Sequence, residues 1–108
     1  MKRGEIWTAA GGADYASKPR SVVVIQDDRF ETNSVTICAF ISDLTDARFI
    51  RPVVEPDETN GLKTFSRLMA DKIATIPKEK LGRRVGRLGS ADMARLERAL
   101  MVFLGLAG

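Results

Sequence analysis

Apolar and polar positions divide the first two thirds of the chain into short runs, the pattern of a small β-sheet. Ser21–Ile25 and Val35–Ile41 are continuous apolar runs rich in β-branched residues. Such runs predict strands that are buried on both faces. We therefore expect these two segments to form the centre of the sheet.

Weaker runs predict four outer strands, over residues 4–8, 48–54, 68–76 and 83–88. Pro52 has no N–H to donate, so its strand should lie at an edge or contain a bulge, and Pro77 should stop the strand before it. Polar connections are expected over 9–19, 27–34 and 55–65. The first is expected to be mobile, and the last contains an Asn60-Gly61 turn. Residues 78–82 predict a single helical turn.

The last element predicted is a helix that begins after Gly89. Ser90 can cap it, and Asp92 is favourable in its first turn. Apolar residues recur at helical spacing and predict one stripe packed on the sheet: Met93, Leu96, Leu100, Phe103 and Leu104. The expected fold is β-rich, a curled antiparallel sheet with one C-terminal helix, which we interpret as a small SH3-like barrel.

The length of 108 residues fits one domain, 1–108, with a modest core, and dimerisation would bury more apolar surface. No apolar run is long enough to span a bilayer, and the N-terminus lacks a signal-peptide apolar region. These features predict a cytoplasmic protein. The single cysteine, Cys38, allows no internal disulfide and is expected to be a small core residue.

The sequence contains no histidine, which removes the commonest general base and metal ligand. One cysteine without histidine cannot supply a plausible zinc site, and Ser-His-Asp or Cys-His catalysis is excluded. We therefore expect no metal and no cofactor. Charge is uneven: residues 1–77 hold 10 basic and 11 acidic side chains, and residues 78–108 hold 7 and 3. The basic end favours either a polyanionic partner or an ordinary solvated surface.

Arg20 and Ser42 are the first candidate site residues. Arg20 begins one central strand and Ser42 follows the other, so antiparallel pairing would bring both to one rim of the sheet. An arginine fork and a hydroxyl suit a phosphodiester and the charge that develops on it. RNA supplies its own nucleophile, the 2′-OH. The alternative is a surface arginine paired with Asp27, Asp43 or Asp71.

Several segments, in order, resemble the PemK/MazF toxins of bacterial toxin–antitoxin pairs. Lys2–Trp7 is similar to the family's opening segment, and Lys18–Gln26 to its second strand. Val35–Asp43, Leu68–Ile76 and Leu81–Leu106 are similar to its third strand, a later strand and its closing region. The resemblance covers nearly the whole chain.

This resemblance implies a homodimeric, metal-independent endoribonuclease that cleaves single-stranded RNA to 2′,3′-cyclic phosphate and 5′-hydroxyl ends. It also implies a cognate antitoxin whose acidic segment blocks the RNA groove. The family's catalytic arginine maps onto Arg20 and its catalytic hydroxyl onto Ser42. The RNA-binding residues implied are Lys18, Asp43 and Lys72.

Two positions depart from the family pattern. After the third strand the family has proline, any residue and two Thr/Ser positions, whereas this chain has Ala39-Phe40-Ile41-Ser42. Only the second hydroxyl position, Ser42, is kept. The later strand has Asp71-Lys72 where Asp-Gln is common.

Two other functions stay open from the sequence. One is a protein-binding toxin of the gyrase-poisoning CcdB type, which shares the fold family but depends on a C-terminal tail with tryptophan. Here the tail is Gly105-Leu106-Ala107-Gly108 and the only tryptophan is Trp7. The other is a non-catalytic RNA-binding relative.

Overall fold

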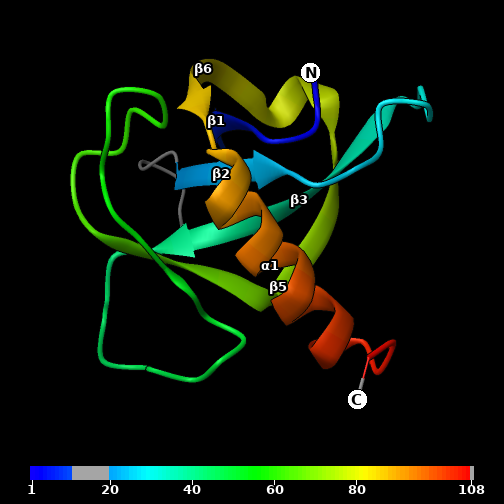
Figure 1. Cartoon of the computed structure of the whole chain (residues 1–108). Helices are drawn as coiled ribbons and strands as arrows, with labels where there is room; N and C mark the ends of the chain where they lie inside the picture. The colour runs from blue at the N-terminus through cyan, green and yellow to red at the C-terminus, as the bar shows by residue number, and fades with distance from the viewer. Residues whose placement is uncertain (11–19, 108) are drawn as a thin grey trace.

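The computed structural model describes residues 1–10 and 20–107, which form one six-stranded antiparallel sheet and one α-helix (Figure 1). The order across the sheet is β4-β5-β3-β2-β1-β6. The element bounds are β1 Glu5–Ala9, β2 Arg20–Val24, β3 Ser34–Ile41, β4 Val53–Val54, β5 Ser66–Pro77, the 3-10 turn η2 Lys78–Lys80, β6 Leu81–Arg87 and α1 Ser90–Phe103. The expected β-rich fold with a C-terminal helix is confirmed.

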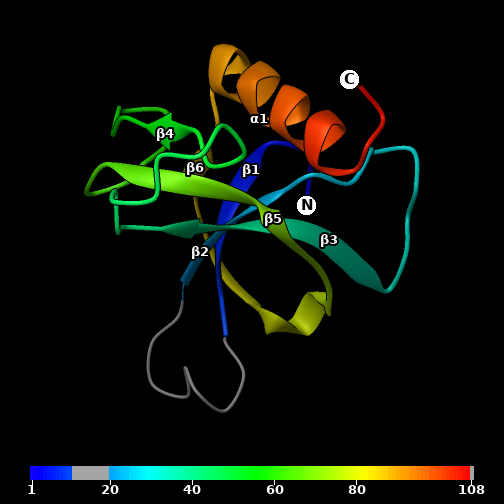
Figure 2. The ribbon, with the colours of Figure 1, turned by 90° about the horizontal axis from the view of Figure 1, so that it is seen from below.

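Strand β2 is buried on both faces, as its apolar run predicts. Val23 faces the cluster that includes α1, whereas Val22 and Val24 belong to a second cluster on the opposite face. All three are less than 5% exposed, and side chains alternate between the two faces of a strand. Figure 2 shows α1 lying along one side of the sheet.

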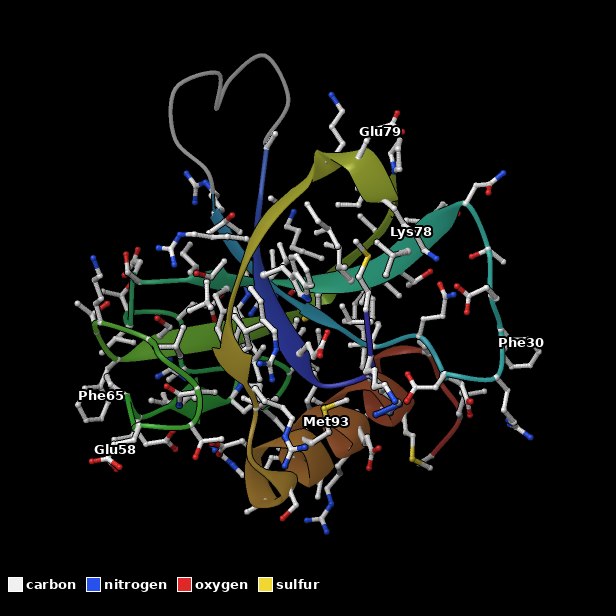
Figure 3. The ribbon with its side chains drawn as sticks, turned by 90° about the horizontal axis from the view of Figure 1, so that it is seen from above. Phe30, Glu58, Phe65, Lys78, Glu79 and Met93 are labelled. Carbon is white, nitrogen blue, oxygen red and sulfur yellow. The ribbon has the colours of Figure 1, made fainter. Side chains whose placement is uncertain are left out.

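Helix α1 packs on the sheet through the first half of the predicted stripe. Leu96 and Ala99 are fully buried, while Met93 and Leu100 pack against the same cluster. Figure 3 shows Met93 where the helix passes close to the sheet. No helix in the described part of the chain is long and apolar enough to cross a membrane.

Two expectations for this helix are wrong. Phe103 and Leu104 are about half exposed (46% and 50%), because the end of the helix extends past the sheet (Figure 1). Ser90 is the first helical residue rather than the cap. Gly89 holds the cap position with extended backbone, and no side chain bonds the free N–H groups there.

The strand expected over 48–54 is reduced to β4, Val53–Val54. Residues 48–51 form a turn instead, in which the Arg51 N–H donates to the Arg48 carbonyl at 2.9 Å. Arg51 forms an ion pair with Asp71 of β5 at 2.8 Å, and the Ile50 and Pro52 carbonyls accept from the N–H groups of Ala70 and Leu68, so the segment still lies along β5. Pro52 lies just before β4, at the edge of the sheet, as expected.

The connection 55–65 packs against β6 through the backbone of its Asn60-Gly61 turn. Asn60 is fully buried, and its side-chain oxygen accepts from the backbone N–H groups of Asp57 (3.0 Å) and Leu62 (2.9 Å). The Arg87 N–H donates to the Thr59 carbonyl at 2.9 Å. A Cβ at Gly86 would stand 2.5 Å from the carbonyl oxygens of Thr59 and Asn60, so only glycine fits there.

Candidate active site

A pocket of about 680 Å³ opens at the end of the sheet where β2 begins and β3 ends. Its walls come from the ends of these strands, from the connection before β5 and from the first half of β6. The lining residues are Thr8, Arg20, Ser21, Phe40, Ser42, Gly61, Leu62, Lys63, Thr64, Ser66, Gly82, Arg83 and Val85.

Arg20 and Ser42 lie together because β2 and β3 are antiparallel neighbours. Val22 pairs with Ala39, and two further steps along this register bring Arg20 opposite Ile41, one residue before Ser42. Arg20 is also held on the other side, where it pairs with Ala9 of β1. The structure thus places both sequence candidates in the wall of one pocket.

Asp43 follows Ser42 but is not among the residues that line this pocket. Its carboxylate accepts from the Thr45 N–H at 2.9 Å and from the Thr45 hydroxyl at 2.8 Å. These bonds lower the pKa of the Asp43 carboxyl. In the structure Asp43 therefore fixes the turn that follows Ser42.

The three carboxylates considered as partners for Arg20 all bind other groups. Asp27 pairs with Arg29 at 3.1 Å, Asp71 pairs with Arg51 at 2.8 Å, and Asp43 accepts from Thr45. The Arg51 guanidinium is the main cause of the lowered pKa of Asp71.

The other RNA-binding candidates are not brought into the pocket. Lys18 lies outside the described residues, as does most of the connection expected over 9–19; Ala9 itself belongs to β1. Lys72 is exposed on β5 and does not line the pocket. Ile41, which stands where the family has its first hydroxyl, is half-buried and pairs with Arg67.

Sequence reasoning missed the far wall of the pocket, which is formed by Lys63, Thr64 and Arg83. These residues come from segments that meet only when the 55–65 connection packs on β6. Thr8 ties the wall together, because its hydroxyl oxygen accepts from the Arg83 N–H at 3.0 Å. The one available signal was the excess of basic residues near the C-terminus.

The pocket is cationic and rich in hydroxyl groups. Arg20, Lys63 and Arg83 line it together with Ser42 and other hydroxyl side chains, and the lining residues in the described chain include no carboxylate. Such a site favours an anion, and arginine is suited to phosphate. Among residues 1–10 and 20–107, no group of three Cys, Asp or Glu side chains could hold a metal ion.

Cys38 is a core residue, as expected. Its thiol is fully buried and donates to the Met69 carbonyl at 3.1 Å. Burial raises the pKa of this thiol to about 12, so it carries almost no thiolate at neutral pH. It cannot serve as the nucleophile of a reaction in the pocket.

A curled antiparallel sheet, one C-terminal helix and a cationic pocket at the rim define the class of small toxin barrels that the sequence resembles. Residues 2–104 match the family described as PemK-like, MazF-like toxin of type II toxin–antitoxin system. The chain belongs to this family.

Related proteins agree with this assignment. The chain is 52% identical over 109 residues to the probable endoribonuclease MazF of Mycolicibacterium smegmatis, covering 100% of both chains. It is 30% identical to the endoribonuclease MazF9 of Mycobacterium tuberculosis, covering 98% of both. Its fold matches an endoribonuclease from a mycobacterial species in complex with its cognate antitoxin, with a TM-score of 0.83, 20% identity and coverage of 100% and 98%.

Proposed function

We propose that the chain is the toxin of a type II toxin–antitoxin pair and cleaves single-stranded RNA, without a metal, in the pocket that contains Arg20 and Ser42. The observation that carries the proposal is that Arg20, at the start of β2, and Ser42, just after β3, line one cationic pocket. The relatives named as endoribonucleases support it, because one of them is 52% identical over the whole chain.

Arg20 binds the scissile phosphate in this proposal. Its guanidinium stays charged and presents several N–H donors, so it stabilises the extra negative charge of the pentavalent transition state. Lys63 and Arg83 on the far wall add positive charge around the same space. A cationic site is favourable for such a dianionic transition state, and the described residues of this pocket's wall include no carboxylate.

The RNA provides the nucleophile. The 2′-oxygen forms a bond to phosphorus, the bond to the 5′-oxygen breaks, and the 2′-OH proton is transferred overall to the leaving oxygen. The products are a 2′,3′-cyclic phosphate and a 5′-hydroxyl. Ser42 contributes a hydrogen bond at the reacting phosphate, in place of the hydroxyl lost at Ile41. Lys18, Asp43 and Lys72 contact RNA beyond the scissile phosphate.

The same proposal covers assembly and partners. The fold also matches a crystal structure of MazE–MazF from Deinococcus radiodurans, with a TM-score of 0.72 and 14% sequence identity. By analogy, this chain forms one domain, 1–108, works as a homodimer in the cytoplasm and is inhibited by a cognate antitoxin that covers its cationic pocket. Such a pocket suits an acidic protein segment.

The test is incubation of the purified protein with a mixed RNA pool in excess chelator, followed by mapping of the new ends. Cleavage with 2′,3′-cyclic phosphate and 5′-hydroxyl ends is expected. Arg20→Ala should lower the cleavage rate by at least about 10³-fold, because the charged donor facing the phosphate is lost. Arg29→Ala, an exposed arginine on another loop, is the matched control.

Loss of cleavage in Arg20→Ala with unchanged circular dichroism supports the proposal. RNA binding without any cleavage by the parent protein identifies a non-catalytic relative instead. Gyrase-linked DNA damage in cells without RNA loss identifies a CcdB-type toxin. Cleavage that disappears in chelator contradicts the metal-free mechanism.

A further inference from the structure

A second pocket, of about 370 Å³, lies between β4, the middle of α1 and the turn that precedes β4. It is separated from the first pocket by a single strand. Ser66 lines the first pocket and Arg67, the next residue, lines the second. Successive residues of a strand point to opposite faces, so the two pockets flank the same end of β5.

Four arginines line this second pocket: Arg48, Arg67, Arg95 and Arg98. Within the described chain, no aspartate or glutamate is part of its wall. Arg48 and Arg95 have carboxylate partners, Asp46 at 2.7 Å and Asp92 at 2.8 Å. Arg67 and Arg98 take part in none of the ion pairs among residues 1–10 and 20–107. The pocket therefore carries positive charge that the described chain does not neutralise.

Two of these guanidinium groups are held in place by backbone carbonyls. Arg67 donates through Nε to Leu44 (3.1 Å) and through Nη1 to Arg51 (2.7 Å), the two ends of the turn region. Arg95 donates through Nη1 to Val53 at 2.7 Å. Neutral carbonyls fix the geometry of a guanidinium without cancelling its charge. Both side chains keep further N–H donors for a ligand.

An aromatic ring stands at the same pocket. Phe49 is 59% exposed and lines it together with Pro52 and Val53. An exposed ring beside arginine forks offers one base a stacking surface and its phosphate several donors. Such stacking contributes about 1–3 kcal/mol per base in single-strand binding proteins.

We infer that this second pocket is an accessory site for a nucleotide of the RNA strand next to the scissile one. The inference rests on the proposed function of the first pocket. RNA is favoured over an acidic protein segment because the exposed ring lies beside the arginines. It is also favoured because one strand end separates the two pockets, so a single flexible RNA strand can reach both.

The test measures binding rather than cleavage, so that it does not depend on activity. The probes are fluorescein-labelled random RNAs of 4 and 12 nucleotides with 2′-O-methyl riboses, which lack the attacking 2′-OH. Arg98→Gln removes an exposed arginine that makes no hydrogen bond or ion pair within the described residues, so folding should be retained. Arg29→Gln gives the same charge change outside both pockets.

We expect Arg98→Gln to weaken binding of the 12-mer by roughly fivefold to tenfold at 0.1 M salt. The slope of log K against log salt concentration should become shallower by about 0.7, because one phosphate contact is lost. Arg98→Gln should change the affinity for the 4-mer little, because the 4-mer is too short to reach both pockets. Arg29→Gln should change the affinity for the 12-mer little. Phe49→Ala, an exposed position, should weaken the 12-mer similarly without changing the salt slope.

Equal binding of the 12-mer by parent and Arg98→Gln overturns the inference. The inference is also overturned if Arg98→Gln weakens the binding of an acidic peptide, such as a poly-glutamate 12-mer, and leaves the binding of the RNA 12-mer unchanged. If the parent binds the 12-mer through this pocket but cleaves no unmodified RNA, the catalytic proposal fails while the binding site stands.

Discussion

At the residue scale, Ser42 offers a hydroxyl where β3 ends and the pocket begins. The preceding residue, Ile41, is paired into the sheet with Arg67 and offers no polar group. The turn after Ser42 is held by the bonds from the Thr45 N–H and hydroxyl to the Asp43 carboxylate. In the proposed mechanism Ser42 supplies the one hydroxyl at this end of β3 that faces the pocket.

Ser42→Ala should slow RNA cleavage by about 10²-fold, because one hydrogen bond to the developing charge is lost from the pocket. The RNA affinity should change much less, since in the proposed mechanism it is Arg20 that binds the phosphate. Single-turnover cleavage and binding to a 2′-O-methyl RNA measure the two effects separately. Ser34→Ala, at the opposite end of the same strand, is the control, and an equal loss in both variants would contradict the role of Ser42.

At the element scale, the connection 55–65 determines the far wall of the pocket. It has almost no regular structure, yet its centre is held by Asn60, whose side chain bonds three backbone groups. The same turn packs on Gly86 of β6. Lys63 and Thr64 follow directly and line the pocket. A buried amide thus positions two residues that no strand supports.

Asn60→Ala should destabilise the protein by about 1–3 kcal/mol, because the backbone groups of Glu55, Asp57 and Leu62 all lose their hydrogen-bond partner in a buried side chain. Urea denaturation followed by circular dichroism measures this change. Asn33→Ala, at an exposed position, should shift the midpoint very little. A midpoint for Asn60→Ala that matches the parent would show that the turn is held by other contacts.

The strands were largely predictable because their signal is local. Ser21–Ile25 and Val35–Ile41 are β-branched runs, and both lie in the sheet within one residue of the expected bounds. The meeting of Arg20 and Ser42 followed from antiparallel pairing alone. The 48–54 segment was only partly right: the Ile50 and Pro52 carbonyls accept from β5, but Pro52 has no N–H to donate and residues 48–51 form a turn, so the regular strand is limited to Val53–Val54. Lys63 and Arg83 were missed because their segments meet only when the 55–65 connection packs on β6.

At the scale of the whole molecule, ion pairs connect the pocket region to the rest of the sheet. Arg51 and Asp71 are both nearly buried and bond through two N–H groups, at 3.0 and 2.8 Å. Asp46 approaches Arg51 at 3.4 Å and bonds Arg48 at 2.7 Å. The network ties the turn before β4 to β5, and both elements border the second pocket.

This network predicts lower stability in acid. Hydrogen bonds from Arg51 lower the pKa of Asp71, and bonds from Arg48 lower that of Asp46 to about 2. A carboxyl whose pKa is lower when folded stabilises the protein above its unfolded value, near 4, and loses this contribution as pH falls through the folded value. Thermal melts at pH 7, 4 and 2.5 should show a steep drop below pH 4.

Asp71→Asn is the matched variant for that experiment. It should be less stable than the parent at pH 7, because Arg51 loses its charged partner, and its stability should fall less between pH 4 and 2.5. Asp28→Asn, an exposed carboxyl outside the network, is the control. Parallel pH curves for the parent and Asp71→Asn would contradict the assignment of the acid sensitivity to this pair.

The end of α1 carries the last whole-molecule prediction, the homodimer. Met101, Val102, Phe103, Leu104 and Leu106, in the last turn of α1 and just after it, are all at least 39% exposed. Several exposed large apolar side chains in one short segment of a small domain favour burial against another surface. A second copy of the chain would supply an identical segment and bury both in a two-fold contact.

Light scattering at micromolar concentration should therefore give about twice the chain mass of 11.9 kDa. Phe103→Glu should give the monomer mass with unchanged circular dichroism, because a buried charge at the two-fold contact is repelled by its copy. Phe65 has a similar exposure of 48% and projects from the 55–65 connection (Figure 3), so Phe65→Glu is the matched control and should stay dimeric. A parent protein that remains monomeric at all concentrations, or a dimer that Phe103→Glu leaves intact, would rule out this contact.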